Sequence, residues 1–358
     1  MQKAWKKTIL QDVARRAGVS AATASRALSK PEIVSAQTRK AVMEAVRETG
    51  YSVNQAGRNL RRRRTDCVVA LLPNLANPFF AQILSGISAE LAPAGYSLLV
   101  CDTQGNPDAE GLVMRYLDRG RADGIIMLDG LIPSDHLDDA ARTQPLPPAV
   151  FACEWVEEMG IPRIRIDNER GAEIAVEHLV SLGHRRIAYL SGPPSNILTI
   201  KREAGYRSAL NAAGLPFGPG LMLAGDFSLF SGAAAAEHWL SMDNPPTAVF
   251  SASDAMAAGF ISVLQRAGRS VPADCSVVGF DDIEVAAHTL PALTTIRQPR
   301  REIGRIAATT LLTLISGQAP VDPDRVLPVE LVVRDSTAAP PRQREHHAAG
   351  PNLRQAGP

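Results

Sequence analysis

The stretch from Ser20 to Arg26 gathers side chains that suit contact with a DNA duplex. It carries Ser20, Ala21, Ala22, Thr23, Ser25 and Arg26, and it follows Gly18, which can end one short helix before another begins. Two short helices joined by such a turn predict a helix-turn-helix, whose second helix enters the major groove. In that groove an arginine can donate two hydrogen bonds to guanine, and alanine methyl groups can contact thymine methyl groups.

Three short helices are expected to position this stretch. The first begins at Thr8, with Gln11 three residues later as a capping box, and the second is capped by Ser20. The third spans about residues 35–48, is capped by Ser35 and ends at Gly50. The residues expected to face a small core are Ile9, Val13, Ala14, Ala17, Ala24, Ala27, Leu28, Val42 and Val46.

Positive charge is concentrated at the start of the chain. Residues 1–64 hold 15 Lys and Arg against 4 Asp and Glu, so they carry +11 of a total net charge of +1, and the rest carries −10. Lys and Arg release condensed counterions when they neutralise phosphates, so this asymmetry favours a polyanionic partner. The alternative is a basic solvated surface with no partner, and the coincidence with a helix-turn-helix pattern argues against it.

Residues 53–65 connect this head to the rest of the chain. Residues 54–60 include helix-forming types but too few apolar ones to pack, and four arginines follow at 61–64. An isolated helix this short is marginal in water, and Gly57 weakens it by about 1 kcal/mol more. We expect a hinge that is frayed alone and helical when docked, and a plain linker is the alternative.

From Asp66 onward, apolar runs of strand length alternate with amphipathic stretches. The expected strands are 67–72, 97–101, 124–128, 149–153, 186–190, 248–251 and 276–280. The expected helices are 79–92, 107–119, 169–182, 201–213, 229–240, 254–267 and 300–316, followed by a strand near 326–333. Repeated β-α-β units predict doubly wound parallel sheets with helices on both faces. Two such series predict two lobes, with a ligand bound beyond the carboxyl ends of the strands.

Composition and motifs exclude several classes of protein. The four cysteines, Cys67, Cys101, Cys153 and Cys275, are widely spaced, which predicts buried thiols rather than a disulfide framework or a metal site. No apolar run is long enough to span a membrane, and the basic N-terminus lacks the apolar region of a signal peptide, so we expect a cytoplasmic protein. No phosphate-binding, nucleophile-elbow, zinc-protease or dinucleotide motif is found, so neither an enzyme nor a cofactor is expected.

Several segments match one family of proteins in order along the chain. They are DVARRAGVSAATASRAL at 12–28, VSAQTRKAV at 34–42, GYSVNQAGRNLR at 50–61, NPFF at 77–80, DGIIML at 123–128, EHLVSLGHRRIAYLSGP at 177–193, PPTAVFSASDAMAAG at 245–259, VPADCSVVGFDD at 271–282 and LTTIRQPRREIG at 293–304. On these segments, which cover about residues 8–336, the chain resembles the lactose-repressor/galactose-repressor (LacI/GalR) family of bacterial transcription regulators. Within that family, GRNLRRRR at 57–64, GDF at 225–227 and the Ser253-Asp254 pair look most like the cytidine-repressor branch.

The resemblance implies an architecture. It places an all-α helix-turn-helix head at 1–52, a hinge helix or linker at 53–65, a two-lobed core similar to periplasmic sugar-binding proteins at 66–335, and a disordered tail at 336–358. It implies three chain crossings between the lobes, with 66–166 and 295–322 in the first lobe and 167–294 and 323–335 in the second. It also implies a homodimer, because no long leucine repeat of the kind that forms tetramers follows Ser336.

For DNA binding, the resemblance assigns three roles. Ala21, Ala22 and Arg26 would meet base edges. Phosphates, which position a protein without specifying sequence, would be bound by Ser20, Thr23, Ser25 and Asn54, and Arg58 belongs to the same DNA-binding set. Leu60 stands at the family's wedge position, where two hinge helices in the minor groove would push leucines between the central base pairs of a palindromic operator. For Ser20 a simple role as a helix cap is the alternative.

For the small-molecule effector, the resemblance implies Phe79, Arg202, Phe227, Ser253, Asp254 and Asp281. The two phenylalanines would supply flat faces for a sugar or base, and Arg202 and Asp281 would hydrogen-bond hydroxyl groups. The alternatives are that the aromatic residues belong to the core and that Asp254 caps the following helix. Ser253 stands where the family mostly has Asn, and Cys153 where many sugar-responsive members have Asp. Both differences favour a nucleoside or another ribose-bearing ligand over a plain hexose.

The resulting hypothesis is a sequence-specific DNA-binding transcriptional repressor that is located at the nucleoid in the cytoplasm. Its operator affinity is controlled by a small sugar or nucleoside bound between the core lobes. Linkage requires the effector and the DNA to change each other's affinity by the same factor, but inducer and corepressor both remain open. The alternatives are a regulator of a pentose or hexose operon, a periplasmic-type sugar-binding protein, and a sugar or nucleoside hydrolase or kinase on the same layers. The basic head and the missing motifs argue against the last two.

Overall fold

The computed structural model describes residues 8–51, 64–103, 122–130, 148–157 and 160–340. The chain divides into two compact units, Met1–Thr65 and Asp66–Pro358. Each unit has its own hydrophobic core, so each is described by itself. The expected helix at 107–119 and most of the hinge at 53–65 lie outside the described residues.

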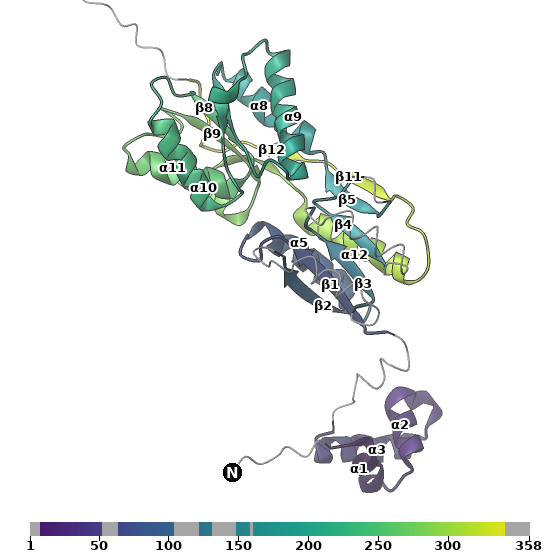
Figure 1. Ribbon diagram of the computed structural model, residues 1–358. Coiled ribbons are helices and arrows are strands. Elements are labelled where there is room, and N and C mark those ends of the chain that lie inside the picture. Colours follow the sequence, from purple (N-terminus) through teal and green to yellow (C-terminus); the bar gives the residue numbers. More distant parts are fainter. Residues whose placement is uncertain (1–7, 52–63, 104–121, 131–147, 158–159, 341–358) are drawn as a thin grey trace, which may run out of the picture. The chain divides into compact units, whose positions relative to one another are not determined.

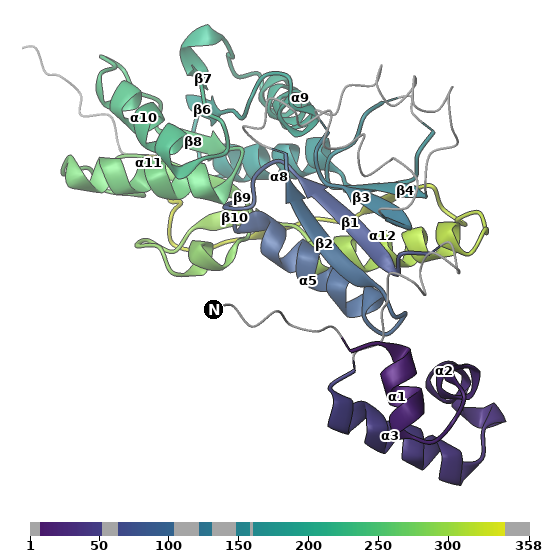
Figure 2. The same cartoon turned by 60° about the horizontal axis from the view of Figure 1, so that its bottom comes forward.

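The first unit is a three-helix head made of α1 (Leu10–Arg16), α2 (Ala21–Ser29) and α3 (Ala36–Thr49), with the short 3-10 turn η1 (Pro31–Ile33) between the last two (Figure 2). Ser20 and Ser35 cap α2 and α3 by accepting hydrogen bonds from the backbone N–H groups of Thr23 and Thr38. Gly50 ends α3 in the left-handed conformation, with φ 62°. The core of the head is small and consists of Val13, Ala14, Ala24, Ala27, Val42 and Ala45.

The expected start of the first helix is wrong by two residues. The helix begins at Leu10, and the carboxylate of Asp12 accepts a hydrogen bond of 3.1 Å from the backbone N–H of Ile9. The hydroxyl of Thr8 donates instead to the carbonyl of Thr49, at 3.0 Å. An ionised carboxylate is a stronger acceptor at a helix N-terminus than a hydroxyl. Ile9 is 51% exposed, so it does not belong to the inner face.

The second unit contains two six-stranded sheets, one in each lobe (Figure 1). The first sheet has the order β11-β5-β4-β3-β1-β2, and all its strands are parallel. Its strands are β1 (Cys67–Leu72), β2 (Ser97–Asp102), β3 (Gly124–Met127), β4 (Ala149–Ala152), β5 (Arg163–Ile166) and β11 (Asp324–Leu327). The helices α5 (Phe79–Leu91) and α12 (Arg300–Ile315) pack against it, with α12 over β3, β4 and β5.

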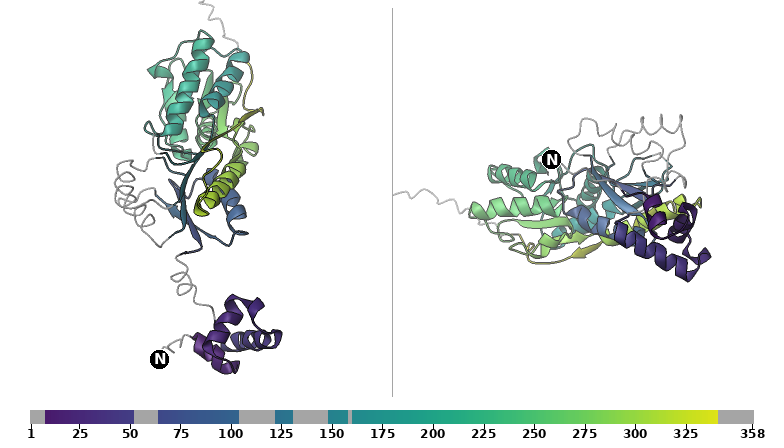
Figure 3. Two further views of the ribbon diagram at one scale, coloured as in Figure 1. Left: turned by 90° about the vertical axis from the view of Figure 1, so that its right-hand side faces the viewer. Right: turned by 90° about the horizontal axis from the view of Figure 1, so that it is seen from below.

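Two glycines let α5 and α12 approach each other closely (Figure 3, left view, α5 blue and α12 yellow-green). A methyl group at Gly86 would overlap the carbonyl oxygen of Arg301, and one at Gly304 would overlap the carbonyl oxygen of Ile83. The missing side chains therefore allow backbone-to-backbone contact between two helices far apart in the sequence. This contact fixes the position of Phe79 and Arg300, which begin these helices.

The second sheet has the order β12-β10-β9-β8-β6-β7 and is parallel except for β12, which is antiparallel to β10. Its strands are β6 (Ile187–Leu190), β7 (Met222–Leu223), β8 (Ala248–Ser251), β9 (Ser276–Asp281), β10 (Thr294–Arg297) and β12 (Glu330–Val332). Figure 1 shows α8 (Asn168–Ser181) and α9 (Ile197–Ala212) on one face, and α10 (Leu229–Leu240) and α11 (Asp254–Arg266) on the other. Short 3-10 turns lie at η2 (Pro219–Leu221) and η3 (Glu284–Ala287).

The chain crosses between the lobes three times, but two of the expected boundaries are wrong. Residues 294–297 form β10 of the second sheet, so the return to the first lobe comes after 297 rather than at 295. Residues 324–327 form β11 of the first sheet, so the last crossing comes after 327 rather than at 323. Asp324 explains the second shift, because its carboxylate bonds Arg163 and Arg165 of β5 at 2.8 Å each.

The beginning of the expected disordered tail is instead packed against the second sheet. Ser336 is fully buried, and its hydroxyl donates to the carbonyl of Val277 at 2.6 Å and accepts from the backbone N–H of Thr294 at 2.8 Å. Ala338 bonds the hydroxyl of Ser276 through both its N–H and its carbonyl. Residues 336–340, called the C-terminal strap below, therefore belong to the core, and residues 341–358 lie outside the described part.

The cysteines only partly follow the expectation of buried thiols. Cys153 and Cys275 are buried, whereas Cys67 and Cys101 are half-buried. Within the described ranges, no three His, Cys, Asp or Glu side chains are grouped so that they could hold a metal ion. None of the helices described has the length and apolar character needed to cross a membrane.

Candidate functional site

The first turns of α2 form the surface of the head that the sequence analysis singled out. Ala21, Ala22 and Arg26 are exposed, while Ala24 and Ala27 point into the core of the head. The helix is thus held from one side by small apolar residues, and its other side offers two methyl groups and one guanidinium to a partner. This is the arrangement that base-edge contact in a major groove requires.

Hydroxyl groups flank this surface. Ser20 is exposed and its hydroxyl lies 2.9 Å from that of Thr23, which is half-buried like Ser25. Ser20 therefore does act as a cap, and its place at the helix N-terminus also leaves it beside the positive end of the helix dipole, where phosphates bind well. Asn54, Arg58 and Leu60 lie outside the described residues, so their DNA-binding roles stay predictions.

In the core, Arg202 is the centre of a buried polar cluster. It is 2% exposed, and its Nε donates to Oδ1 of Asn168 at 2.9 Å while its Nη1 donates to the carbonyl of Ala252 at 2.5 Å. Nη1 also lies 3.9 Å from Oδ1 of Asp281, and the guanidinium carbon lies 3.8 Å from the centre of the Phe280 ring. A buried charge with this many partners is held in one geometry.

Asp281 lies at the end of β9 with a backbone φ of 118°, which is rare for a residue with a side chain. Its Oδ1 accepts a 2.7 Å hydrogen bond from the amide of Gln298. Burial raises the pKa of Asp281 to about 6, although Arg202 and Arg300 favour its charged form. The strained backbone of Asp281 and the hydrogen bond from Gln298 together fix the carboxylate of Asp281 beside Arg202.

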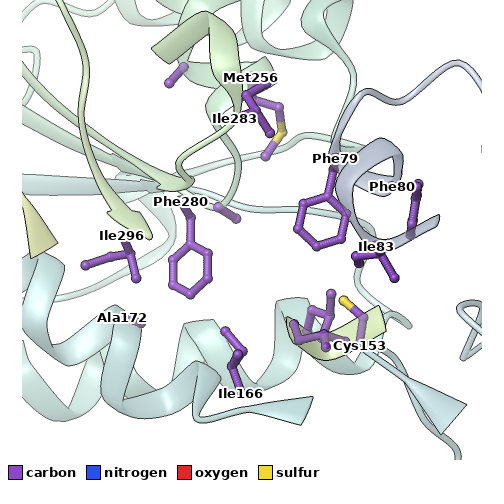
Figure 4. Packing of buried hydrophobic residues seen from close by; sticks show 14 of the residues in the cluster. Phe79, Phe80, Ile83, Cys153, Ile166, Ala172, Met256, Phe280, Ile283 and Ile296 are labelled. Carbon is purple, nitrogen blue, oxygen red and sulfur yellow. The ribbon is translucent and has the colours of Figure 1, made fainter. Parts of the chain in front are cut away.

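Phe79 reaches the same region from the first lobe. Its backbone N–H is bonded by Asn77 at 3.0 Å, and its ring lies edge-on to Phe80 with 5.1 Å between centres. Arg300 joins it to the second lobe, because Nη1 donates to the carbonyl of Phe79 at 3.5 Å and Nη2 to the carbonyl of Asp282 at 2.8 Å. Figure 4 shows the ring of Phe79 directed into the packed region that also holds Phe280 and Cys153.

Phe227 approaches the cluster from a different loop, and its φ of 67° marks another strained backbone. Its ring lies directly against Gly192, where a methyl group would overlap ring carbon Cζ. The same imaginary methyl group would lie 2.5 Å from the hydroxyl of Thr199, so the ring and this hydroxyl are neighbours. The half-buried Phe227 ring can therefore offer an edge or face to a molecule bonded by Thr199.

Three buried polar atoms of this region have no hydrogen-bond partner: Oγ1 of Thr199, Oε1 of Gln298 and Nε of Arg300. An unsatisfied buried polar group costs about 1–3 kcal/mol, so such groups call for a partner. A hydroxyl, an amide oxygen and a guanidinium N–H together offer both donors and acceptors. The cluster is therefore suited to an uncharged polar molecule with hydroxyl groups, and burial lowers the pKa of Arg300 without removing its donor.

Ser253 and Asp254 both make structural contacts within the second lobe. The hydroxyl of Ser253 caps α11 by accepting from the backbone N–H of Met256 at 3.3 Å. Asp254 is fully buried, and its two carboxylate oxygens accept from the hydroxyl of Thr295 at 2.6 Å and the backbone N–H of Ile283 at 2.9 Å. Burial, and then the nearby Asp281, raise its pKa. These contacts make Asp254 a support for the Asp281–Ile283 turn, and the effector-binding roles of Ser253 and Asp254 stay predictions.

Comparison with known proteins decides the family. Bacterial regulatory proteins of the lacI family match residues 9–54, and a periplasmic binding protein-like domain matches residues 176–337. The HTH-type transcriptional repressor CytR of Escherichia coli (strain K12) is 39% identical over 332 residues, 93% of this chain and 97% of CytR. The protein belongs to the lacI family of bacterial transcription regulators.

Solved structures of lacI-family proteins agree with this assignment. The lac repressor dimer bound to operator and the anti-inducer ONPF is 33% identical, with a TM-score of 0.83 over 93% of this chain and all of that chain (100%). The complex of the transcriptional regulator CelR with cellobiose is 34% identical, with a TM-score of 0.70 over 92% of this chain and 99% of that one. The predicted family, the two-part fold and a regulatory rather than enzymatic function are confirmed for this lacI-family protein.

Sequence reasoning missed several polar residues that the lacI-family core brings together. Asn168 and Gln298 hold Arg202 and Asp281, and Asn196 and Glu154 lie beside them. Asn168 and Asn196 lie at the beginnings of α8 and α9, where an asparagine is ordinarily interpreted as a helix cap. Their positions along the chain could have indicated Glu154 and Gln298. Glu154 follows the carboxyl end of β4 and Gln298 follows that of β10, and ligands of α/β sheets bind at these strand ends.

Proposed function

We propose that this protein represses transcription by binding a palindromic operator through α2, and that a small sugar or nucleoside in the core controls the affinity. The observation that carries the DNA-binding part is the exposure of Ala21, Ala22 and Arg26 on a helix fixed from behind by Ala24 and Ala27. Ser20, Thr23, Ser25, Asn54 and Arg58 would bind phosphates around that helix. A regulator acting on DNA works at the nucleoid in the cytoplasm.

The effector would bind at the cluster around Arg202, Asp281, Phe79 and Phe227. Support comes from the unpartnered polar atoms of Thr199, Gln298 and Arg300, which lie among residues contributed by both lobes. A ligand bonded by both lobes favours one arrangement of the two, and any change transmitted to the head alters operator affinity. The 39% identity to CytR and the Cys153 and Ser253 differences favour a nucleoside.

A homodimer is the proposed working form. The second unit exposes large apolar side chains at Leu229 and Phe230 of α10 and at Val285 and Leu290 around η3, and Phe230 is 84% exposed. A contiguous apolar surface is typical of a site that a partner covers, and we propose that these residues belong to such a surface. The related lac repressor is a dimer on its operator. Two heads related by a two-fold axis would read a palindrome, with each Leu60 inserted at its centre.

Band-shift titration of the full chain tests the proposal. Genomic fragments selected by the protein should contain a palindrome, bind it in the nanomolar range at moderate salt, and release or tighten when cytidine or adenosine is added. Absence of any preferred fragment at low ionic strength would contradict the DNA-binding function. A preferred fragment with no response to nucleosides or sugars would contradict the effector part alone.

Regulation by a sugar is the second candidate, because the CelR complex with cellobiose has the same fold at 34% identity. The two candidates differ in what stabilises the core. Thermal-shift measurements with cytidine, adenosine, D-ribose and cellobiose separate them, since a ligand at a hundred times its dissociation constant stabilises by about 2.7 kcal/mol. Stabilisation by cellobiose alone would favour the sugar regulator.

A further inference from the structure

A row of polar residues runs along one side of α9. Asn196, Thr199 and Arg202 follow one another at three-residue intervals, which places their side chains on the same side of a helix. All three are at least nine-tenths buried. Arg202 ends the row at one side, where Asn168 and Asp281 hold it.

The other end of the row is a contact between the lobes. Oδ1 of Asn196 accepts from the backbone N–H of Leu198 at 2.8 Å, and the side chain of Asn196 lies near Glu154, which follows β4 of the first lobe, and lowers the pKa of its carboxyl group. Glu154 accepts a hydrogen bond of 2.9 Å from the backbone N–H of Gly130. It is 4% exposed, and none of the described Lys, Arg or His residues forms an ion pair with it. A carboxylate buried among neutral donors retains capacity to accept further hydrogen bonds.

Thr199 lies between these two ends with its hydroxyl unpartnered. The residue is 2% exposed, and the Phe227 ring is next to it across Gly192. The row therefore has Arg202 at one end, Asn196 with the nearby Glu154 at the other, and an unpartnered hydroxyl beside an aromatic ring in the middle. Thr199 thus stands between Asn196, which lies near Glu154, and Arg202 in the order of the row.

We propose that Glu154 and Thr199 bind the effector directly, with Glu154 accepting hydrogen bonds from the hydroxyl groups of a sugar ring. This inference rests on the function proposed above and adds the chemical class of the group that faces the first lobe. The sugar ring can be a free sugar or the ribose of a nucleoside. A carboxylate has about four lone-pair directions; Gly130 uses one of them, and the nearby amide of Asn196 leaves the others open to a ligand.

The charge state of Glu154 makes the inference testable by pH. Burial raises the pKa of Glu154 to about 7; the hydrogen bond from Gly130, the nearby amide of Asn196 and the charge of Arg202 oppose the shift, and Asp129 adds to it. The titratable and charged groups that face it are Asp129 from the end of β3, Arg202 from α9 and the neighbouring Cys153, whose thiol pKa burial raises further. Ionised Glu154 is the stronger acceptor, so affinity for a hydroxyl-bearing ligand should rise as the pH increases through about 7.

Calorimetric titration of the full chain with cytidine, 2′,3′-dideoxycytidine and D-ribose at pH 6 and pH 8 is the test. Glu154→Gln keeps the size of the side chain but removes its titration, and Thr199→Val keeps the shape but removes the hydroxyl. Glu157→Gln, an exposed carboxylate of the same loop, is the matched control. Operator band-shifts of every variant show that it is folded and binds DNA.

The wild type and Glu157→Gln are expected to bind cytidine or D-ribose more tightly at pH 8 than at pH 6. Dideoxycytidine should bind at least about tenfold more weakly than cytidine. Glu154→Gln should lose about tenfold in affinity and keep only the smaller pH dependence that Asp281, whose pKa is about 6, contributes, and Thr199→Val should lose about fivefold. Wild-type affinity and pH dependence in Glu154→Gln, or equal binding of cytidine and dideoxycytidine, would overturn the inference. If neither cytidine nor D-ribose binds at millimolar concentration, the inference fails, whereas the thermal shift with cellobiose and the operator band-shift report separately on the proposed effector function and on DNA binding.

Discussion

The ring of Phe227 lies so close to the backbone of Gly192 that a methyl group on Gly192 would overlap the ring. Phe227 holds this position with a left-handed backbone, at φ 67°. A residue without a side chain is thus needed at position 192 for the aromatic ring to reach Thr199. The relationship connects one glycine directly to the proposed effector site.

Gly192→Ala should therefore weaken effector binding by about tenfold or more, because the added methyl group displaces the Phe227 ring and the Thr199 hydroxyl. Operator binding without effector should be retained. Calorimetry with the best-binding ligand and a band-shift measure the two properties. Gly220→Ala is the matched control, since a side chain at Gly220 meets open space. Equal losses in both variants would show that the effect is not specific to the ring.

Arg26→Ala should relax base preference at one operator position by about 1–3 kcal/mol, because an exposed guanidinium at this place on α2 is proposed to pair with guanine. Binding to a panel of single-base operator variants measures the preference. Arg39→Ala removes an exposed arginine of α3 and should leave the preference unchanged. A uniform loss over all operator variants would instead indicate a phosphate contact for Arg26.

Leu60→Ala should cost much of the specific affinity for a palindromic operator and leave nonspecific DNA binding nearly unchanged. The reason is that unstacking of the central base step, at a few kcal/mol, depends on an apolar wedge, whereas phosphate contacts do not. Competitive band-shifts against nonspecific DNA separate the two affinities. Parallel losses, or no loss, would rule out the wedge.

The C-terminal strap should make stability sensitive to mild acid through His184. Its Nδ1 and Nε2 lie 2.9 Å from the Thr247 hydroxyl and the Ala338 carbonyl, so the neutral ring satisfies both contacts. Burial lowers the pKa of His184, and the bond to Ala338 opposes this. The His184 ring is therefore protonated less readily in the folded protein than in the unfolded chain. The contribution of His184 to folding stability is complete above about pH 6.5 and is lost as the pH falls below it.

Melting temperatures of the wild type and His184→Gln between pH 7.5 and pH 5.5 test this effect. The wild type should lose more melting temperature over that interval than His184→Gln, whose side chain stays neutral. His288→Gln changes an exposed histidine and should follow the wild type. An identical change of melting temperature in His184→Gln and the wild type would show that His184 does not cause the sensitivity to acid.

The sequence predicts secondary structure correctly where local hydrophobic patterns determine it. The apolar run 67–72 and the amphipathic stretch 229–240 coincide with β1 and α10. β5 (Arg163–Ile166) was missed because two of its four residues are arginines. Those arginines are neutralised by Asp324, which is more than 150 residues away in the chain. A partner that distant leaves no local signal in the sequence.

The site was predictable in its outline but not in its details. Family resemblance supplied Phe79, Arg202, Phe227 and Asp281, and the structure brings Arg202 and Asp281 within 3.9 Å. It could not supply the strained backbone of Phe227 and Asp281, because a positive φ is signalled in sequence by glycine and neither residue is one. It also could not supply the contacts of Asp254 with Thr295 and Ile283, because these depend on how three separate segments meet.

The order of the edge strands has a consequence for any shortened form of the protein. Ile166 pairs with Leu327 in the first sheet and Arg297 with Glu330 in the second, so all three passages between the lobes run side by side. β11 and β12, which border the last passage, are outermost in their respective sheets. A chain that ends before Asp324 would thus lack one edge strand in each sheet. Truncation at this end of the polypeptide therefore destabilises both lobes together.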